Sequence, residues 1–397
     1  MNSAWFLLKP RCFERRCTKV QKKQLKYFDI WIIMIMIGLV MIGIVAIGSA
    51  THINNPNIEP YYVDKQIKGF ILGFILMLIT AFIDYRFIGR FYPLLYLVLI
   101  GLLFAVLKFG KEVNHATRWL EIGSTAIQPS EFGKIIMILV IAKLMDKFQK
   151  NINHIVIVVF ILFLTIIPVL FIQKQPDLST SLVILFIVAA QFYVAKISYI
   201  YILPTAMATV LGVLGVLWAA YQPGQEILRK ILKPHQVTRI MSFIDPDQFA
   251  MSGAYQTNQA IRAIGSGQLN GKGLYQGTLN QFQYLLEART DFIFAVIGEE
   301  FGFIGCMAVI ILFFLFTTRC LWIAKDAPDL YGRLIVVGVG SMIFIQSFIH
   351  IGVTTGFLPN TGIPLPFISY GLSALWSNMI GVGLVLNVGM SRKKMRY

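Results

Sequence analysis

Long apolar runs separated by short polar stretches dominate the chain. Two examples are the segments 29–50, DIWIIMIMIGLVMIGIVAIGSA, and 152–173, INHIVIVVFILFLTIIPVLFIQ. Each reaches the roughly 20 residues that a helix needs to cross a hydrocarbon core of about 30 Å, whereas membrane strands are half as long and alternate. Ten such runs predict an all-α polytopic membrane protein with about ten transmembrane helices. They lie at roughly 29–50, 68–84, 92–109, 131–147, 152–173, 178–195, 199–221, 291–317, 332–355 and 367–389.

Basic residues flank the first and last of these runs. Before the first run, eight Lys and Arg stand against Glu14 alone, and the last residues include Arg392, Lys393, Lys394 and Arg396. Positive charge near span ends marks the cytoplasmic side. We therefore expect both termini in the cytoplasm, which requires an even number of spans. The first run is too long for a signal peptide and lacks its cleavage pattern.

The spans divide the chain into five parts. We expect a basic cytoplasmic tail (1–28), helices 1–7 (29–221), a large extracellular loop (222–290), helices 8–10 (291–389) and a basic tail (390–397). Loops of this length in a compact bundle are usually functional or disordered. This loop carries seven Lys and Arg against four Asp and Glu. A basic outer surface suits an anionic ligand or anionic lipid headgroups.

Composition supports the membrane assignment. The 397 residues are 57% hydrophobic and 14% charged, with a mean hydropathy of +0.70, whereas soluble proteins have about 25% charged residues. The tails explain only part of the net charge of +16. Cys12 and Cys17 match no common zinc or redox spacing, and Cys306 and Cys320 lie in or just after one apolar run. We expect packing, or at most palmitoylation, and no disulfide framework.

The stretch AIGSGQLNGKGLYQG contains five glycines around Lys272. A P-loop needs four residues between its first Gly and the Gly-Lys pair, followed by Ser or Thr. Here five and three residues separate Gly265 and Gly267 from Gly271, and Gly273 follows the lysine. The dinucleotide pattern G-x-G-x-x-G fails by one residue. The stretch is therefore expected to be a structural hinge or to bring Lys272 to a lipid phosphate.

Ionisable side chains at membrane depth cost roughly 2.5–3.5 kcal/mol each, so they are functional or tightly paired. Glu131 and Lys134 open the fourth span at positions i and i+3, where they can pair on one helix face. Pro129 and Ser130 mark the start of that helix. The pair is expected either to orient the helix or to bind a ligand. Asp177 stands between the next two spans and can cap the sixth helix or face a ligand.

Asp291 lies at the mouth of the predicted eighth span, and Glu299 and Glu300 lie inside it. Eight residues of helix between Asp291 and Glu299 correspond to about 12 Å. The two carboxyls of a glycosidase pair are only roughly 5–9.5 Å apart. Asp291 is therefore expected to act alone or with Glu287 in the neighbouring loop.

Arg118 and Trp119 lie on the expected outer side, between the third and fourth spans. A Trp here is typical of an interfacial aromatic belt, and an Arg beside it suits phosphate oxygens. The charged residues above and the proline-rich turn LPNTGIPLPFISYG map to the same side. A cationic cleft with one carboxylate is what a polyprenyl-pyrophosphate sugar donor needs.

At these residues the chain resembles the SEDS family of bacterial elongation, division and sporulation proteins, typified by RodA, FtsW and SpoVE. The segments QPDLSTS and GSGQL favour a RodA-like member. The matching segments occur in family order and cover most of the chain: TRWLEIGSTAIQPSEFGKI, QPDLSTSLV, YQTNQAIRAIGSGQLNGKGLYQGT, EARTDFIFAVIGEEFGFIG and TGFLPNTGIPLPFISYG. The family has a ten-helix fold with a large outer loop between helices 7 and 8.

The resemblance implies a peptidoglycan glycosyltransferase that polymerises lipid II into β-1,4 glycan strands on the outer face of the cytoplasmic membrane. Asp291 matches the family's essential aspartate. It is expected to be the general base that takes the proton from the acceptor's 4-hydroxyl, with inversion at the donor carbon. The basic residues would offset pyrophosphate charge, and Glu131 would position Lys134. The expected substrate-binding residues are Arg118, Trp119, Glu131, Lys134, Lys272 and Glu287.

The resemblance also concerns cofactors and partners. It leaves open a divalent cation, Mg²⁺ or Mn²⁺, at Asp291. A class B penicillin-binding protein, which is a transpeptidase, is the expected partner, and no nucleic acid is expected.

The chain departs from the family pattern at two places. The residues Leu372, Ser373 and Ala374 replace the usual glycine-serine run after PFISYG, and His350 and Val353 stand where Asn and Met are usual. These changes bear on the shape of the lipid-side groove and on whether the chain is a specialised member.

Two other functions stay open. A lipid II flippase, or a non-catalytic scaffold for a transpeptidase, would share these motifs, and Glu299, Glu300 and Lys134 suit a transport path. A secondary transporter for a small solute would show inverted repeats with discontinuous helices. The sequence shows no such repeat.

Overall fold

A computed structural model describes residues 27–392, with gaps. The gaps are 53–57, 114–115, 123–124, 202, 205–206, 208–210, 213–214, 216–217, 220–233, 250 and 252. The N-terminal tail with Cys12 and Cys17, most of the C-terminal tail, much of the predicted seventh span and the first part of the large loop therefore lie outside the described residues.

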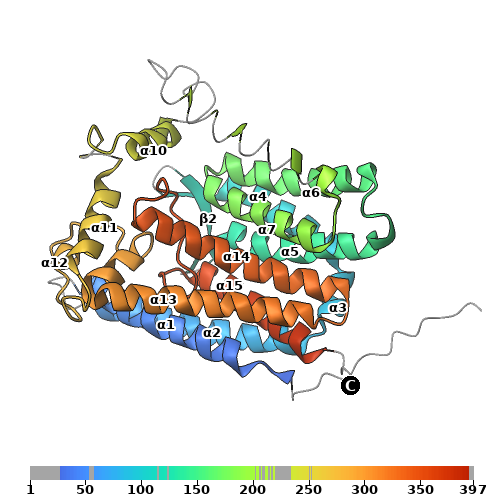
Figure 1. Cartoon of the computed structure of the whole chain (residues 1–397), viewed down its shortest axis with the longest axis horizontal. Helices are drawn as coiled ribbons and strands as arrows, with labels where there is room; N and C mark the ends of the chain where they lie inside the picture. Colours follow the sequence, from blue (N-terminus) through green and yellow to red (C-terminus); the bar gives the residue numbers. More distant parts are fainter. Residues whose placement is uncertain are drawn as a thin grey trace, which may run out of the picture.

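Long helices lie side by side in the described part of the chain (Figure 1). They are α1 (Ile30–Thr51), α2 (Ile58–Phe82), α4 (Tyr92–Phe109), α5 (Pro129–Lys147), α6 (Ile155–Lys174), α7 (Leu178–Val194), α13 (Ile293–Lys325), α14 (Leu330–Thr354) and α15 (Leu372–Met390). Among the described helices, seven are long and apolar enough to cross a membrane. The other two are α7, which has 17 residues, and α5, which carries several charges. The all-α polytopic prediction is confirmed.

Most predicted spans agree with these helices to within a few residues. The main differences at their starts are in α2, which begins ten residues before the predicted 68, and α15, which begins at Leu372 and not at 367. The polar side chains of Lys65 and Gln66 hid the first turns of α2 from a search for apolar runs. Before α15, Phe367 has a φ of 65°, which a helix does not allow.

Shorter elements lie at the two ends of the bundle. Helices α10 (Pro234–Ile244), α11 (Tyr255–Ser266) and α12 (Thr278–Gln281) gather at one end, and α3 (Tyr85–Arg90) lies at the other (Figure 1). The 3-10 helix η2 (Gln149–Asn151) follows α5. A small antiparallel sheet of β1 (Lys111–Val113), β2 (Ala116–Ile122) and β3 (Thr125–Ile127) has the order β1-β2-β3. The sequence does not predict this sheet, because β1 and β3 have only three residues each and the seven residues of β2, ATRWLEI, do not alternate between apolar and polar.

Helix α13 is broken at Gly302, whose φ of 64° and ψ of −160° are not helical. A Cβ built on Gly298 would lie 3.3 Å from Sγ of Cys306, although eight residues of straight helix rise about 12 Å. The chain therefore folds back at Gly302. The residues before it form a short half-helix, 293–301, whose residues 293–300 are buried, and Gly298 in it lies against Cys306 of the longer part. The sequence analysis expected one continuous helix here and missed the break.

The glycine-rich stretch around Lys272 forms hydrogen bonds with the residues on both sides of this break. Four backbone hydrogen bonds join the two segments: Lys272 N to Glu299 O, Gly273 N to Glu300 O, Phe303 N to Gln268 O and Ile304 N to Leu269 O. A buried break in a helix frees amide and carbonyl groups that need partners, and the stretch supplies them. A Cβ at Gly271, where φ is 80°, would lie 2.1 Å from the Glu300 carbonyl oxygen, so glycine is required there.

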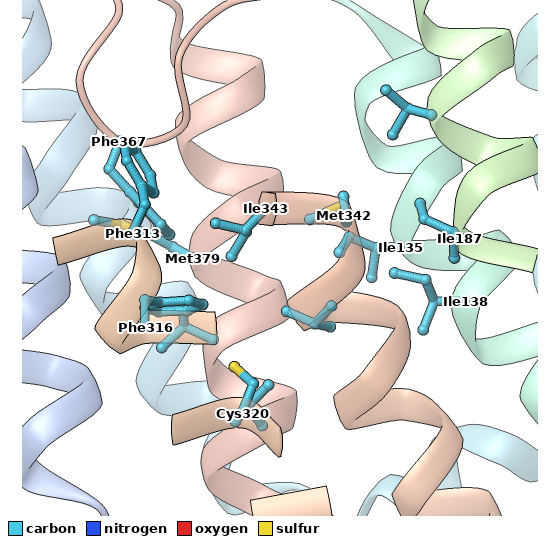
Figure 2. Close-up of a cluster of buried hydrophobic side chains, with 14 of the residues drawn as sticks. Ile135, Ile138, Ile187, Phe313, Phe316, Cys320, Met342, Ile343, Phe367 and Met379 are labelled. Carbon is cyan, nitrogen blue, oxygen red and sulfur yellow. The ribbon is translucent and has the colours of Figure 1, made fainter. Parts of the chain in front are cut away.

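The core of the bundle is a continuous set of aliphatic and aromatic side chains from α5, α7, α13, α14 and α15 (Figure 2). In a membrane, close packing rather than water exclusion holds helices together. Phe316 and Phe367 stack at a tilt with centroids 5.9 Å apart. Cys306 and Cys320 are free and buried, which agrees with their expected packing role.

Successive long helices run in opposite directions, so their ends alternate between the two sides of the bundle. The starts of α2, α5, α7 and α15 therefore share one end with the last turns of α4, α6 and α14. The described part of the large loop, with α10, α11 and α12, lies at this end as well (Figure 1). At the opposite end, Arg319 pairs with Asp29 at 2.8 Å.

Candidate active site

A cavity of about 880 Å³ lies at the loop end of the bundle. Its walls come from the starts of α2, α5, α7 and α15, from α10 and α14, from β2, and from the turns before α13 and α15. Its charged lining residues are Lys65, Arg118, Glu121, Glu131, Asp177, Arg239, Glu287, Arg289 and Asp291. Ligand pockets typically have volumes of about 300–1,000 Å³, so the cavity can hold a substrate headgroup.

Asp291 lies in the turn that leads into α13. The amides of Thr290 and Phe292 each donate to the Glu287 carbonyl oxygen at 3.2 Å, and the Thr290 hydroxyl donates to the Glu287 carboxylate at 3.0 Å. Gly362, with a φ of 70°, brings its backbone against the Asp291 carboxylate. Within the described chain, no group donates a hydrogen bond to that carboxylate. It is therefore free to accept a proton from a ligand.

The surroundings of Asp291 favour its protonated form. Burial and the negative charge of Glu287 raise the pKa of Asp291 to about 6, while the positive charges of Arg239 and Arg118 act in the opposite direction. Such a value is close to the pH at which a general base works best. The arrangement thus fits a carboxylate that takes up and releases a proton.

Two arginines line the same cavity, and their positive charges act on the Asp291 carboxylate. The Arg118 guanidinium donates to the carbonyl oxygens of Gln175, at 3.2 Å, and Pro176, and that of Arg239 donates to the Thr361 carbonyl oxygen at 3.4 Å. Burial and the nearby charge of Arg118 lower the pKa of Arg239. The positive charges of the two guanidinium groups repel each other, and a bound anion would relieve this repulsion.

Glu131 and Lys134 form the expected ion pair, at 2.8 Å, and the lysine is only 1% exposed. The Glu131 carbonyl oxygen also accepts a hydrogen bond from Ser377 of α15 at 2.7 Å. Glu131 lines the cavity, whereas Lys134 does not. Of the two roles left open by the sequence, the structure supports orientation of α5, with Lys134 behind the wall.

Asp177 caps α7, as its position suggested. Its carboxylate accepts from the Thr180 amide at 3.1 Å and from the Thr180 hydroxyl at 2.8 Å. It also accepts from the Gln128 side chain at 3.3 Å, and the Gln128 amide donates to the Ser373 hydroxyl at 3.0 Å. These bonds join the starts of α5, α7 and α15 into one polar wall.

The departures from the family pattern lie on or beside this wall. Leu372, Ser373 and Ala374 line the cavity. His350 is buried, and its Nδ1 lies 2.8 Å from the Ile363 carbonyl oxygen in the proline-rich turn. Val353 is buried one turn further along α14.

Lys272 does not line this cavity, so the structure gives no support to the expectation that it meets the pyrophosphate. Its ammonium group pairs with Glu299 at 2.7 Å and donates to the Thr278 hydroxyl at 2.7 Å. The amides of Leu279 and Asn280 also donate to the Glu299 carboxylate, at 3.0 and 3.3 Å. The lysine therefore compensates a carboxylate that is 0% exposed, and the hinge role of the glycine-rich stretch is the one that the structure supports.

The structure brings together Arg118, Trp119, Glu131, Glu287 and Asp291 of the expected site residues. The sequence analysis missed Lys65, Arg239, Arg289 and Tyr370 as lining residues. Arg239 and Arg289 were seen only as loop charges, and Lys65 stands just before a predicted span. The sequence signal that could have identified these lining residues is a basic residue beside the outer end of a predicted span.

The groups around Asp291 fit a resident divalent cation poorly. The described residues contain no cluster of three or more His, Cys, Asp or Glu side chains that could hold a metal ion. Arg118 and Arg239 already place positive charge beside Asp291.

Known proteins are similar to this chain in sequence and in fold. The family model of FtsW, RodA and SpoVE, described as cell cycle proteins, matches residues 24–394. The peptidoglycan glycosyltransferase MrdB of Escherichia coli (strain K12) is 34% identical over 333 residues, which are 83% of this chain and 86% of MrdB. Stage V sporulation protein E of Bacillus subtilis (strain 168) is 35% identical over 337 residues, with 83% and 87% covered.

A solved structure is similar as well. It is described as "Structural coordination of polymerization and crosslinking by a peptidoglycan synthase complex". One of its chains has a TM-score of 0.75 and 27% identity, and the match covers 92% of this chain and 99% of that one.

Proposed function

Because the chain belongs to the FtsW, RodA and SpoVE family of cell cycle proteins, we propose that it is a peptidoglycan glycosyltransferase that polymerises lipid II with Asp291 as its general base. One observation supports this most directly. The Asp291 carboxylate lies in a cavity beside two arginines, and no described group donates a hydrogen bond to it. The site thus offers a proton acceptor next to a place for a pyrophosphate.

The reaction needs one proton transfer and one displacement. Asp291 takes the proton from the 4-hydroxyl of the acceptor sugar as that oxygen attacks the anomeric carbon of the donor. The bond between this carbon and the pyrophosphate oxygen breaks, and polyprenyl pyrophosphate leaves with the electron pair. A single base without a covalent intermediate gives inversion, from an α-linked donor to a β-1,4 product.

Arg118 and Arg239 stabilise the charge that develops on the leaving group. Arginine binds phosphate oxygens through two parallel N–H donors, and its backbone hydrogen bonds here hold it in place before the substrate arrives. Trp119 and Glu131 line the same cavity. Glu287 acts on the pKa of Asp291 through its charge.

The surrounding architecture fits this role. The protein is a multi-pass membrane protein, and we place both termini in the cytoplasm and the loop 222–290 outside, so that the cavity opens toward the outer face. The similarity to a chain of a peptidoglycan synthase complex supports a penicillin-binding protein as partner, and we propose one of class B.

Polymerisation of labelled lipid II by the purified protein, alone and with its transpeptidase partner, tests the proposal. Wild type should give glycan polymer on a gel. Asp291→Asn should reduce the rate by about 100-fold or more, since a positioned base contributes about 10²–10⁴-fold. Asp326→Asn, at the opposite end of the bundle, is the matched control and should keep full activity. Equal polymer from wild type and Asp291→Asn would refute the assignment.

The flippase alternative rested on buried charges that would form a transport path. In the structure Glu299 pairs with Lys272, Glu300 accepts from Ser49, and Lys134 pairs with Glu131. These groups are thus engaged in local contacts. No specific observation favours transport over polymerisation.

A further inference from the structure

A second group of cations lies on the wall formed by α2 and by the turns before α13 and α15. Lys65, Arg289 and Tyr370 all line the cavity there. The Tyr370 amide donates to the Arg289 carbonyl oxygen at 2.9 Å. The Arg289 guanidinium lies 4.3 Å from the centre of the Tyr62 ring, which meets the Tyr370 ring edge-on at 5.2 Å. Two turns and one helix start thus hold this group together.

These two cations lack an anionic partner. Neither Lys65 nor Arg289 forms an ion pair with a carboxylate among the residues that the structure describes. Lys65 donates to the Tyr61 hydroxyl, and the Arg289 guanidinium lies over the Tyr62 ring. No described group accepts a hydrogen bond from this guanidinium, so its N–H donors are available to a ligand.

The two cation groups act on different parts of the cavity. The charges of Arg118 and Arg239 act on Asp291, whereas those of Lys65 and Arg289 act on Tyr370, whose pKa burial raises and these cations lower. Asp291 therefore has one cation pair near its carboxylate and a second, separate pair on the α2 wall of the same cavity.

Polymerisation joins two lipid-linked saccharides, and each one carries a pyrophosphate. Only the donor's pyrophosphate leaves in the reaction, but the acceptor's must also lie in the low-dielectric surroundings of the site. An uncompensated charge there would be costly. One pair of arginines can neutralise only one of the two groups.

We propose that Lys65 and Arg289, with the Tyr370 hydroxyl, form a second anion subsite that binds the pyrophosphate of the acceptor, while Arg118 and Arg239 bind that of the donor. This inference rests on the proposed function. It explains why a single cavity has two cation pairs on different walls, with the proton acceptor Asp291 beside the donor pair.

The number of bound pyrophosphates tests this assignment without any turnover. In titration calorimetry with undecaprenyl pyrophosphate in detergent, wild type should bind two equivalents. The double variant Lys65→Gln/Arg289→Gln should bind one, and so should Arg118→Gln/Arg239→Gln. Lys68→Gln is the matched control, because Lys68 lies one turn from Lys65, pairs with Asp64 and is 72% exposed. It should bind two.

The remaining equivalent in each double variant also shows that the variant is folded. The second subsite would be refuted if Lys65→Gln/Arg289→Gln bound two equivalents. It would also be refuted if wild type bound only one equivalent and this variant still bound it. The proposed function would survive either result if Asp291→Asn still reduced the rate of polymer formation in the gel assay by about 100-fold or more.

Lipid II has two kinds of anionic group that this wall could bind, the pyrophosphate and the carboxylates of its peptide. A second measurement distinguishes between them. Polymerisation is followed with lipid II and with a lipid-linked disaccharide that lacks the peptide. Loss of the second subsite should raise KM by about tenfold or more for both substrates, with a smaller effect on kcat. A KM increase restricted to lipid II would assign the wall to the stem peptide and refute the inference.

Discussion

At the scale of single residues, the surroundings of Asp291 fit its proposed role as general base. Other buried carboxylates in the described part of the chain accept hydrogen bonds, as Glu299 does from Lys272 and two amides. Such bonds stabilise the ionised form and make it a weak base. Asp291 has none among the described residues, and Glu287 adds a like charge. The ionised form is therefore less stable, and the group accepts a proton more readily.

This environment predicts an acid limb in the pH dependence of polymerisation. The base must be ionised, and with a pKa of about 6 only about one Asp291 in ten is ionised at pH 5. The value of kcat/KM should thus fall as the pH drops through about 6, not through the ordinary value near 4. Glu287→Gln removes the like charge, so it should lower the pKa and move the limb to lower pH.

Initial rates of lipid II polymerisation between pH 4.5 and 8, with Asp326→Asn as control, measure this limb. The control should keep the wild-type midpoint. A wild-type midpoint near 4, or a Glu287→Gln profile shifted to higher pH, would contradict the account of the Asp291 surroundings.

At the scale of elements, the half-helix before Gly302 links the large loop to the active site. Its first residue, Ile293, follows Asp291 by two positions, and its last turn holds Glu299 and Glu300. The glycine-rich stretch binds that last turn through backbone hydrogen bonds and through Lys272. Displacement of the stretch would therefore move the half-helix and, with it, the proton acceptor.

Glycine at position 302 should be essential for this link. Gly302→Ala places a Cβ 2.4 Å from the Gly271 amide nitrogen, at a positive φ and with a ψ of −160°. Strain of this kind costs about 1–3 kcal/mol, so thermal unfolding in detergent should begin at a lower temperature. Activity should fall with it, because Asp291 shifts.

Gly265→Ala is the matched control for that substitution. Gly265 belongs to the same stretch, lies in the last turn of α11 and has no atom within 4 Å of its built Cβ. Alanine favours a helix over glycine by about 1 kcal/mol, so this variant should unfold at or slightly above the wild-type temperature. If Gly302→Ala matched it, the break would not depend on glycine.

At the scale of the whole molecule, alternation of helix direction decides which charges meet. The cavity lies with the starts of α2, α5, α7 and α15 at the loop end, while the Asp29 and Arg319 pair lies at the other. On the proposed topology these ends face the outside and the cytoplasm. A membrane protein in this orientation presents its cavity to a lipid-linked substrate in the outer leaflet.

Labelling with a membrane-impermeant maleimide tests this orientation. In a chain with Cys12→Ser and Cys17→Ser, the native Cys306 and Cys320 are buried. Tyr284→Cys, in the large loop, should react in intact cells, whereas Lys150→Cys, exposed after α5 at the opposite end, should react only after permeabilisation. The reverse pattern would place the cavity on the cytoplasmic side.

The sequence by itself determined the class of fold and pointed to Asp291, Glu131 and Asp177 as candidate site residues. Apolar runs of about 20 residues can be satisfied only by membrane helices, because backbone groups in lipid need internal partners. The motif around Asp291 and the i, i+3 spacing of Glu131 and Lys134 are local, so both could be predicted from neighbouring residues. The same holds for the cap at Asp177.

Only the tertiary structure decided which distant charges meet. Lys272 is 27 residues from Glu299, and its pairing depends on the break at Gly302, which an apolar pattern does not reveal. Lys65, Arg239 and Arg289 come from a helix start, a loop helix and a turn, and share one cavity only because the helix ends that carry them alternate in space. Hydropathy measures how each segment meets the membrane, whereas the partner of a charge depends on how the segments pack against one another.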